Sequence, residues 1–287
     1  MSNIFKTTLL LTVMTLLLML AGRAFGGQNG MLIALAFAAV MNFVSYFFSD
    51  KIALATYRAQ PVSREDLPRV YNIVERLAQK EGLPMPKIYV IPTDSPNAFA
   101  TGRNPNHASV AVTQGILGLL NDDELEGVIA HELGHVRNRD ILISSIAATL
   151  AGAITWLASI ARWGMIFGGM RGERDDHGGG GIAAIAMIFL APFAAMLIQL
   201  AVSRSREYGA DDTGAHWTGN PYALASALAK IDAYSKQRPL IASPSTAHLF
   251  IIQPFLGGMS FGSLFSTHPP TAKRIERLTG RPAEFFQ

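Results

Sequence analysis

The sequence predicts a membrane protein that is mainly α-helical, with four transmembrane helices in two hairpins and with α/β segments outside the membrane. Nearly half of its 287 residues are hydrophobic and only 16% are charged, against about 25% in an average soluble domain. Four long apolar segments interrupt the polar sequence. The absence of cysteine excludes disulfides and thiolate metal sites. The net charge of +3 is too small and too scattered to indicate a nucleic-acid partner.

The apolar segments are residues 7–22, 31–48, 141–161 and 182–202. A bilayer core needs about 20 apolar residues in a helix, a length that the last two segments meet and the second meets marginally. The first is short unless Ile4 and Phe5 join it and the Lys6 side chain extends to the membrane surface. Short polar or Gly-rich turns separate the members of each pair, so we expect two hairpins. Two alternatives remain open: a signal peptide at the first segment, and a buried hairpin of a soluble domain for the second pair.

Positive charges predict the orientation. Lysines and arginines follow the second span, precede the third and follow the fourth (Lys51, Arg58, Arg64, Arg137, Arg139, Arg204 and Arg206). The hairpin tips carry fewer, and two of those lie among acidic residues. By the positive-inside rule, both termini and both polar regions face the cytoplasm. The chain therefore divides into an N-terminal membrane hairpin (1–49), a cytoplasmic segment (50–140), a second membrane hairpin (141–203) and a C-terminal cytoplasmic part (204–287).

The segment 50–140 has the pattern of a compact α/β unit. Its elements are an amphipathic helix and three strand candidates, at Leu67–Gly82, Lys87–Pro92, Asn97–Gly102 and Ala108–Thr113. Another helix begins after Asn121, which is a suitable N-cap, with Glu124 three residues later to complete a capping box. Beyond the fourth span, two more helices are expected, around Tyr222–Tyr234 and Thr271–Leu278.

The helix after Asn121 contains the sequence HELGH. His131 and His135 are four residues apart, so both imidazoles project from one face and can bind one metal ion. Glu132 is rotated by about 100° from His131, which places its carboxylate beside the ion as a general base for a metal-bound water. This pattern predicts a catalytic zinc ion, one per chain. The alternative is a pair of surface histidines with a solvated glutamate between them.

A catalytic zinc requires a third protein ligand and one open position. The candidates are Glu207, Asp211, His216, His248 and His268. Glu207 and Asp211 lie four residues apart, just after the fourth span, and we assign Glu207 as the ligand. Asp211 then accepts a hydrogen bond from the free N–H of a ligand histidine. The alternative is an ordinary charged helix face that also includes Arg204 and Arg206.

The second hairpin connects these two parts of the site. His135 precedes Ile141 by six residues, about 9 Å of helix, and Glu207 follows Val202 by five residues, about 7–8 Å. If both helices continue out of the membrane, the hairpin itself brings the ligands together.

The combination of HELGH, a hairpin and then SREYGAD resembles the HtpX-type membrane zinc metalloproteases, relatives of the integral-membrane CAAX prenyl proteases. The resemblance covers essentially the whole chain, including NAFATG at Asn97–Gly102 and STHPPTAKRIERL near the C-terminus. It implies a zincin-like endopeptidase of the bacterial inner membrane, which faces the cytoplasm and acts in quality control of misfolded or damaged membrane proteins. It implies that His131, His135 and Glu207 are ligands and that Glu132 is the catalytic base.

Two weaker expectations come from the same resemblance. His268 of the HP motif would donate to the oxyanion, and Arg274 would orient substrate or hold a carboxylate. The alternative for His268 is packing ahead of the last helix. Asn97–Gly102 or Ala108–Thr113 would be the edge strand that binds an extended substrate, although their small side chains suit an ordinary hairpin equally well.

Other functions predict different sequence features. A transporter should carry ionisable groups inside its spans, whereas the strong polar groups there are almost confined to Asn42 and Gln199. A non-enzymatic scaffold with a structural zinc would have four ligands and no spare base. A dedicated processing protease for one membrane substrate is an alternative to broad quality control. The expected partners are thus unfolded or membrane-protein substrates and the lipid bilayer.

Overall fold

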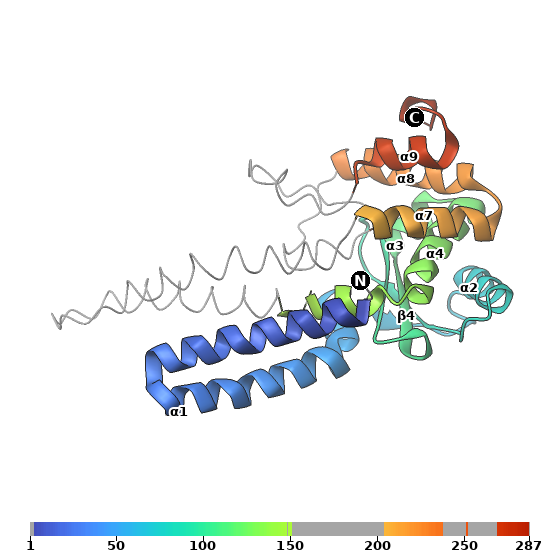
Figure 1. Cartoon of the computed structure of the whole chain (residues 1–287). Helices are drawn as coiled ribbons and strands as arrows, with labels where there is room; N and C mark the ends of the chain where they lie inside the picture. The colour runs from blue at the N-terminus through green and yellow to red at the C-terminus, as the bar shows by residue number, and fades with distance from the viewer. Residues whose placement is uncertain (1–2, 148, 151–203, 238–250, 252–268, 287) are drawn as a thin grey trace, which may run out of the picture.

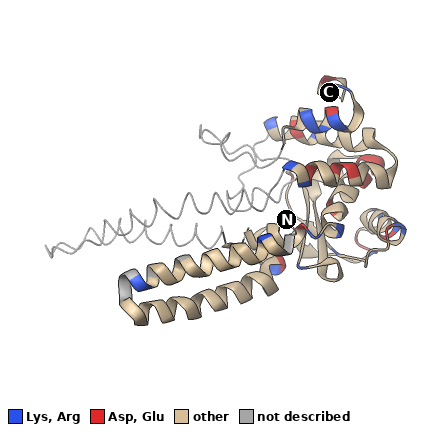
Figure 2. Cartoon of the chain, viewed as in Figure 1, with Lys and Arg blue, Asp and Glu red and all other residues tan. Residues whose placement is uncertain are grey.

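The structure is a computed structural model that describes residues 3–147, 149–150, 204–237, 251 and 269–286. An N-terminal helical hairpin extends from a body in which helices cover a small sheet (Figure 1). Charged residues lie mostly in the body and are almost absent from the hairpin (Figure 2). This distribution is the one expected if the hairpin lies in lipid and the body lies in water.

Helix α1 (Asn3–Thr56) folds back on itself to make the hairpin. Gly27 has a φ of 60°, a left-handed conformation that glycine adopts without steric cost. Gly22 and Gly30 bring the two arms together, because a Cβ atom on Gly22 would lie 2.4 Å from the carbonyl oxygen of Gly30. Farther along the arms, the Asn42 amide donates to the Thr15 hydroxyl at 2.9 Å. The first two apolar segments therefore form the hairpin that the sequence predicts.

Large apolar side chains on this hairpin face outward, among them Leu20, Ile33 and Val40, each more than half exposed. Among the described residues, one helical segment, Gly27–Thr56, is long and apolar enough to cross a membrane, and Phe5–Leu20 is a shorter apolar helix. The third apolar segment is described only as far as residue 150, with helix at residues 141–147 and 149–150. The fourth lies outside the described residues, so the expected number of four spans stays a prediction.

The sheet has four strands in the order β1-β2-β4-β3. They are β1 (Gln60–Pro61), β2 (Lys87–Ile91), β3 (Ala98–Gly102) and β4 (Ala108–Thr113), with a short 3₁₀ turn, η1 (Pro105–His107), before β4. β2 and β4 are parallel, whereas β1 pairs with β2, and β3 with β4, in antiparallel fashion. All three predicted strands are present. Of the two strands proposed as a substrate-binding edge, β3 lies at an edge of the sheet and β4 lies inside it.

The helices of the body are α2 (Pro68–Lys80), α3 (Gln114–Leu119), α4 (Asp122–Arg137), α7 (Arg204–Thr218), α8 (Pro221–Gln237) and α9 (Thr271–Thr279), followed by a 3₁₀ turn, η3 (Ala283–Phe286). α4 is central, because it contacts β3, α2, α7 and α8. Its predicted capping box is present, with the Asn121 side chain accepting from the Glu124 N–H and the Glu124 carboxylate accepting from the Asn121 N–H. α2 buries the predicted apolar face of Val70, Ile73, Val74 and Leu77.

One hydrophobic core joins the segment before residue 141 to the segment after residue 203. It includes Leu125 and Ile129 of α4, Leu224 and Leu228 of α8, and Ile275 of α9, all at most 1% exposed. The body therefore needs both segments to bury its core, although about sixty residues separate them in the sequence.

Two glycines set how closely α4 and α7 approach. A Cβ atom on Gly214 would lie 3.0 Å from the backbone nitrogen of His131, and a Cβ atom on Gly134 would lie 3.3 Å from Thr213 Cβ. Larger residues at these positions would push the two helices apart. The side chains of Glu207 and Asp211, on the same helix as Gly214, are thereby brought to the histidines of α4.

Candidate metal centre

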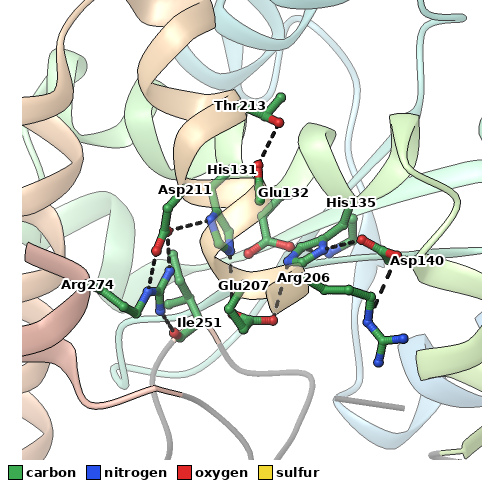
Figure 3. Close-up of polar contacts among 12 residues, drawn as sticks. His131, Glu132, His135, Asp140, Arg206, Glu207, Asp211, Thr213, Ile251 and Arg274 are labelled. Carbon is green, nitrogen blue, oxygen red and sulfur yellow. Dashed lines mark hydrogen bonds and ion pairs between the residues drawn. The ribbon is translucent and has the colours of Figure 1, made fainter. Parts of the chain in front are cut away.

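Three potential metal ligands meet between α4 and α7 (Figure 3). Nε2 of His131 lies 3.8 Å from Oε2 of Glu207, and Nε2 of His135 lies 3.6 Å from Oε1 of the same carboxylate. The two imidazole rings are perpendicular, with centroids 4.9 Å apart. The ligand atoms of all three residues lie within 4.8 Å of one another. The structure thus brings together the three residues that the sequence predicts as ligands.

This donor set suits a single zinc ion. Zinc–nitrogen and zinc–oxygen bonds of about 2.1 Å in a tetrahedral site place neighbouring ligand atoms about 3.4 Å apart, close to the separations from Glu207 to both histidines. Two imidazoles and one carboxylate are also a usual protein ligand set for catalytic zinc, because they leave a fourth position for water or substrate.

His131 faces a buried ion pair on the side away from Glu207. Its Nδ1 lies 2.9 Å from Oδ1 of Asp211. Arg274 donates to both oxygens of that carboxylate, from Nε at 2.8 Å and from Nη2 at 2.6 Å, and its Nη1 donates to the carbonyl of Ile251. Arg274 and Asp211 are each at most 1% exposed. Of the two roles expected for Arg274, holding a carboxylate is therefore the one visible in this geometry.

The charge on Asp211 favours one tautomer of His131. Burial alone would raise the pKa of Asp211, but the guanidinium of Arg274 lowers it to about 2. Burial lowers the pKa of His131 and thereby favours the neutral ring. An ionised carboxylate beside Nδ1 favours a proton on that nitrogen and leaves the lone pair of Nε2 available to a metal.

His135 has a corresponding partner that sequence reasoning missed. Its Nδ1 lies 3.2 Å from Oδ2 of Asp140, and the other oxygen of Asp140 lies 3.9 Å from Nε of Arg206. Burial lowers the pKa of His135, but the hydrogen bond with Asp140 and the charge of Glu207 raise it to about 9. A signal was present in the sequence: an aspartate five residues after His135, directly before an apolar segment.

Glu132 lies beside the ligand cluster and touches the sheet. Its Oε2 accepts a hydrogen bond of 3.0 Å from the backbone N–H of Ala100 in β3. Burial, which is the largest effect, and the negative charge of Glu207 raise the pKa of Glu132 to about 7, against the opposing effect of His135. A carboxylate with a pKa near neutrality is suited to accept and return a proton.

Among the described residues, the cluster contains none of the other histidines considered as third ligand. His216 is exposed, near the end of α7. His248 and His268 lie outside the described residues, so the expected role of His268 as an oxyanion donor stays a prediction.

Comparison with known proteins agrees with this geometry. Residues 63–282 match the model of peptidase family M48. The chain is 58% identical to the "Protease HtpX homolog" of Desulforapulum autotrophicum, over 97% of this chain and 90% of the relative. It is 57% identical to the protein of the same name from Syntrophobacter fumaroxidans, over 97% of this chain and 99% of the relative. It is also 57% identical to the one from Pyrococcus furiosus, over 95% of this chain and 94% of the relative.

The fold is also similar to that of a protein of known structure. The crystal structure of S. mikatae Ste24p aligns with a TM-score of 0.54 at 20% identity and covers 96% of this chain. The aligned region spans 65% of that longer protein, and at this identity the similarity concerns the fold alone. Since the family model covers most of the sequence and the curated relatives match nearly all of it, the chain belongs to peptidase family M48, among its HtpX-type members.

Proposed function

We propose that this M48 peptidase is a zinc-dependent endopeptidase of the cytoplasmic membrane, with His131, His135 and Glu207 as ligands and Glu132 as catalytic base. One observation carries the proposal: the three ligand atoms converge between α4 and α7, directly beside a buried carboxylate that is not needed to complete the ligand set. Zinc, when bound there, would polarise the scissile carbonyl and lower the pKa of the attacking water.

Glu132 supplies the proton transfers. It accepts a proton as the water oxygen bonds to the carbonyl carbon, and it returns that proton to the leaving amine as the C–N bond breaks. Burial raises the pKa of this carboxylate, which favours the return of the proton from it. Asp211 and Arg274, which are both buried, would hold His131 in the orientation that this arrangement requires.

β3 is the proposed binding edge for an extended substrate. The backbone N–H of Ala100 points away from β4 toward Glu132, so this side of the strand faces the catalytic carboxylate. A peptide paired with this edge by backbone hydrogen bonds would present its carbonyls beside the ligand cluster. Alanines and a glycine dominate β3, which suits recognition that tolerates many substrate sequences.

The substrates that we propose are misfolded or damaged membrane proteins and unfolded polypeptides. The apolar hairpin α1 supports a membrane location, and the positive charges outside the apolar segments support a cytoplasmic active site and cytoplasmic termini. The proposed division remains two membrane hairpins (1–49 and 141–203) and two cytoplasmic parts (50–140 and 204–287) that together form the site.

The catalytic proposal is tested by casein cleavage with the full chain purified in detergent. Glu132→Gln should lower the cleavage rate by at least about 10²-fold while zinc content stays unchanged. A chelator should abolish cleavage and added zinc should restore it. The matched control is Glu126→Gln, since Glu126 lies on the same helix but pairs with Arg76 away from the cluster. Cleavage by Glu132→Gln at the original rate would refute the assigned base.

Orientation is tested by labelling single cysteines in whole cells, because the unaltered chain contains none. Cysteine at Gln28, at the hairpin tip, should react with a membrane-impermeant maleimide added outside the cytoplasmic membrane. Cysteine at Asp123, an exposed position at the start of α4, should react only after lysis. The reverse pattern would contradict the proposed orientation.

A further inference from the structure

The two histidines of the metal centre have outer partners of the same kind. His131 is followed outward by Asp211 and then by Arg274, and His135 is followed outward by Asp140 and then by Arg206 (Figure 3). In both, Nδ1 faces a carboxylate and that carboxylate faces a guanidinium. The two sets differ in where the outer residues lie along the chain. Arg274 comes from α9, whereas Asp140 and Arg206 lie at the two ends of the segment 141–203.

We infer that Asp140 is a positioning residue for His135, and that it couples metal retention to the placement of the two ends of the segment 141–203. The inference rests on the proposed zinc site. Asp140 is 4% exposed, and its Oδ2 lies 3.2 Å from Nδ1 of His135, which leaves Nε2 directed at Glu207. Rotating the ring by half a turn would put carbon atoms in the places of the two nitrogens and break both contacts.

A tight turn places Asp140 under the histidine. α4 ends at Arg137, and Arg139 adopts a left-handed conformation with a φ of 58°, uncommon for a residue other than glycine. The backbone N–H of Asp140 then donates to the carbonyl of His135 at 3.0 Å. The chain thus folds back on the last turn of α4, so that the side chain of Asp140 reaches the His135 ring instead of pointing to solvent.

The same carboxylate touches the other end of the segment. Oδ1 of Asp140 lies 3.9 Å from Nε of Arg206, which directly precedes the ligand Glu207 and has a side chain only 11% exposed. The backbone carbonyl of Asp140 accepts from the N–H of Ser144, so Asp140 directly precedes the helix that starts at residue 141. A shift of one end of the segment relative to the other would therefore move His135 or Glu207.

The inference is tested by zinc affinity, measured by competition with a chromogenic chelator on the full chain in detergent. Asp140→Ser removes the carboxylate from the His135 ring and should raise the zinc Kd by about 10–100-fold, the usual effect of losing a partner that orients a ligand. Asp140→Asn should raise it less, because the amide oxygen can still accept from Nδ1–H. The control Asp212→Ser, on the outer face of α7 and paired with the exposed Arg277, should leave the Kd within about twofold.

The comparison of serine with asparagine separates positioning from a merely structural role. Both residues are good helix N-caps, so a role limited to starting the helix at residue 141 predicts equal Kd values for the two variants. Equal values, or a Kd unchanged by Asp140→Ser, would overturn the inference while leaving the proposed function intact. If Asp140→Ser fails to fold, the isosteric Asp140→Asn decides alone: a Kd raised several-fold supports the inference and an unchanged Kd overturns it. Failure of the unaltered chain to bind zinc would overturn both proposals.

Discussion

Arg274 and Asp211 form a buried bidentate ion pair, and the same carboxylate lies 2.9 Å from Nδ1 of His131. Through this pair, α9 is joined to α7 and to the helix that carries the histidines. Asp212, the next residue on α7, pairs with Arg277, the same type of interaction at a solvent-exposed position. The two adjacent pairs allow the effect of burial to be measured with nearly identical chemistry.

Removing Arg274 should be far more destabilising than removing Arg277. Arg274→Met leaves the carboxylate of Asp211 buried without its counter-charge and should lower the free energy of unfolding by about 3–5 kcal/mol. Arg277→Met leaves the carboxylate of Asp212 in contact with water, so little change in the free energy of unfolding is expected. Denaturant unfolding of both variants in detergent measures the difference, and equal losses would show that Arg274 does not stabilise Asp211 as described.

Enlarging Gly214 should separate α4 from α7. The added Cβ atom of Gly214→Ala would lie 3.0 Å from the backbone nitrogen of His131, which cannot move without shifting the helix. We expect a loss of about 1–3 kcal/mol in the free energy of unfolding, together with weaker zinc binding.

Gly209→Ala is the matched control on the same helix, because no packing neighbour in the described part of the chain lies within 4 Å of the position that its methyl group would take. Alanine is the better helix former, so this variant should be neutral or more stable by up to about 1 kcal/mol. Thermal unfolding and zinc titration of both variants test the prediction. A Gly214→Ala protein that behaves like Gly209→Ala would show that the helices are not in tight contact there.

Glu124 should make the fold sensitive to acid. Although burial raises the pKa of Glu124, the hydrogen bonds from Lys230, Ser226 and the Asn121 N–H lower it below 4.5. A lowered pKa in the folded state means that the stabilisation is present above the pKa of the unfolded chain. It is lost as the pH falls through the lower pKa of the folded state.

Glu124→Gln should therefore destabilise the protein at pH 7, on the order of 1 kcal/mol, and the difference from the unaltered chain should shrink below about pH 4. Unfolding temperatures measured from pH 7 to pH 3.5 follow this convergence. Glu75→Gln, at an exposed pair with Arg64, serves as the control. A difference in unfolding temperature between Glu124→Gln and the unaltered chain that stays constant with pH would contradict the assignment of Glu124 as the titrating group.

Metal removal should destabilise the body even without any substitution. Because the proposed ligands come from α4 and α7, free zinc at 100 times its Kd should stabilise the folded state by about 2.7 kcal/mol. We expect a chelator to lower the unfolding temperature by roughly 5–10 °C. The shift should be much smaller in Glu207→Gln, and a full shift in that variant would place the metal elsewhere.

The sequence predicts those parts of the fold that depend on local pattern. The spacing of Val70, Ile73, Val74 and Leu77 is sufficient to define α2, and Asn121 with Glu124 marks the start of α4. Helical geometry alone puts two histidines four residues apart on one face. The two-residue strand β1 has no such pattern and escapes prediction.

Contacts that depend on turns and on packing were beyond sequence reasoning. The approach of Asp140 to His135 requires the left-handed turn at Arg139, which is unusual for arginine. The contact of Glu132 with Ala100 depends on how β3 packs against α4, which no residue spacing reveals. For Arg274, the sequence left two roles open, and only the packing of α9 against α7 shows which group it holds.

The order of the site residues along the chain has a consequence for biosynthesis. His131, Glu132 and His135 are translated first, Glu207 and Asp211 follow only after the segment 141–203, and Arg274 comes later still. If the proposed roles hold, a ribosome-bound or prematurely terminated chain that stops before residue 207 has the histidines and Glu132 but lacks one metal ligand. Incomplete products would then have no proteolytic activity, and a newly made chain would not cleave its neighbours until its later helices have been synthesised.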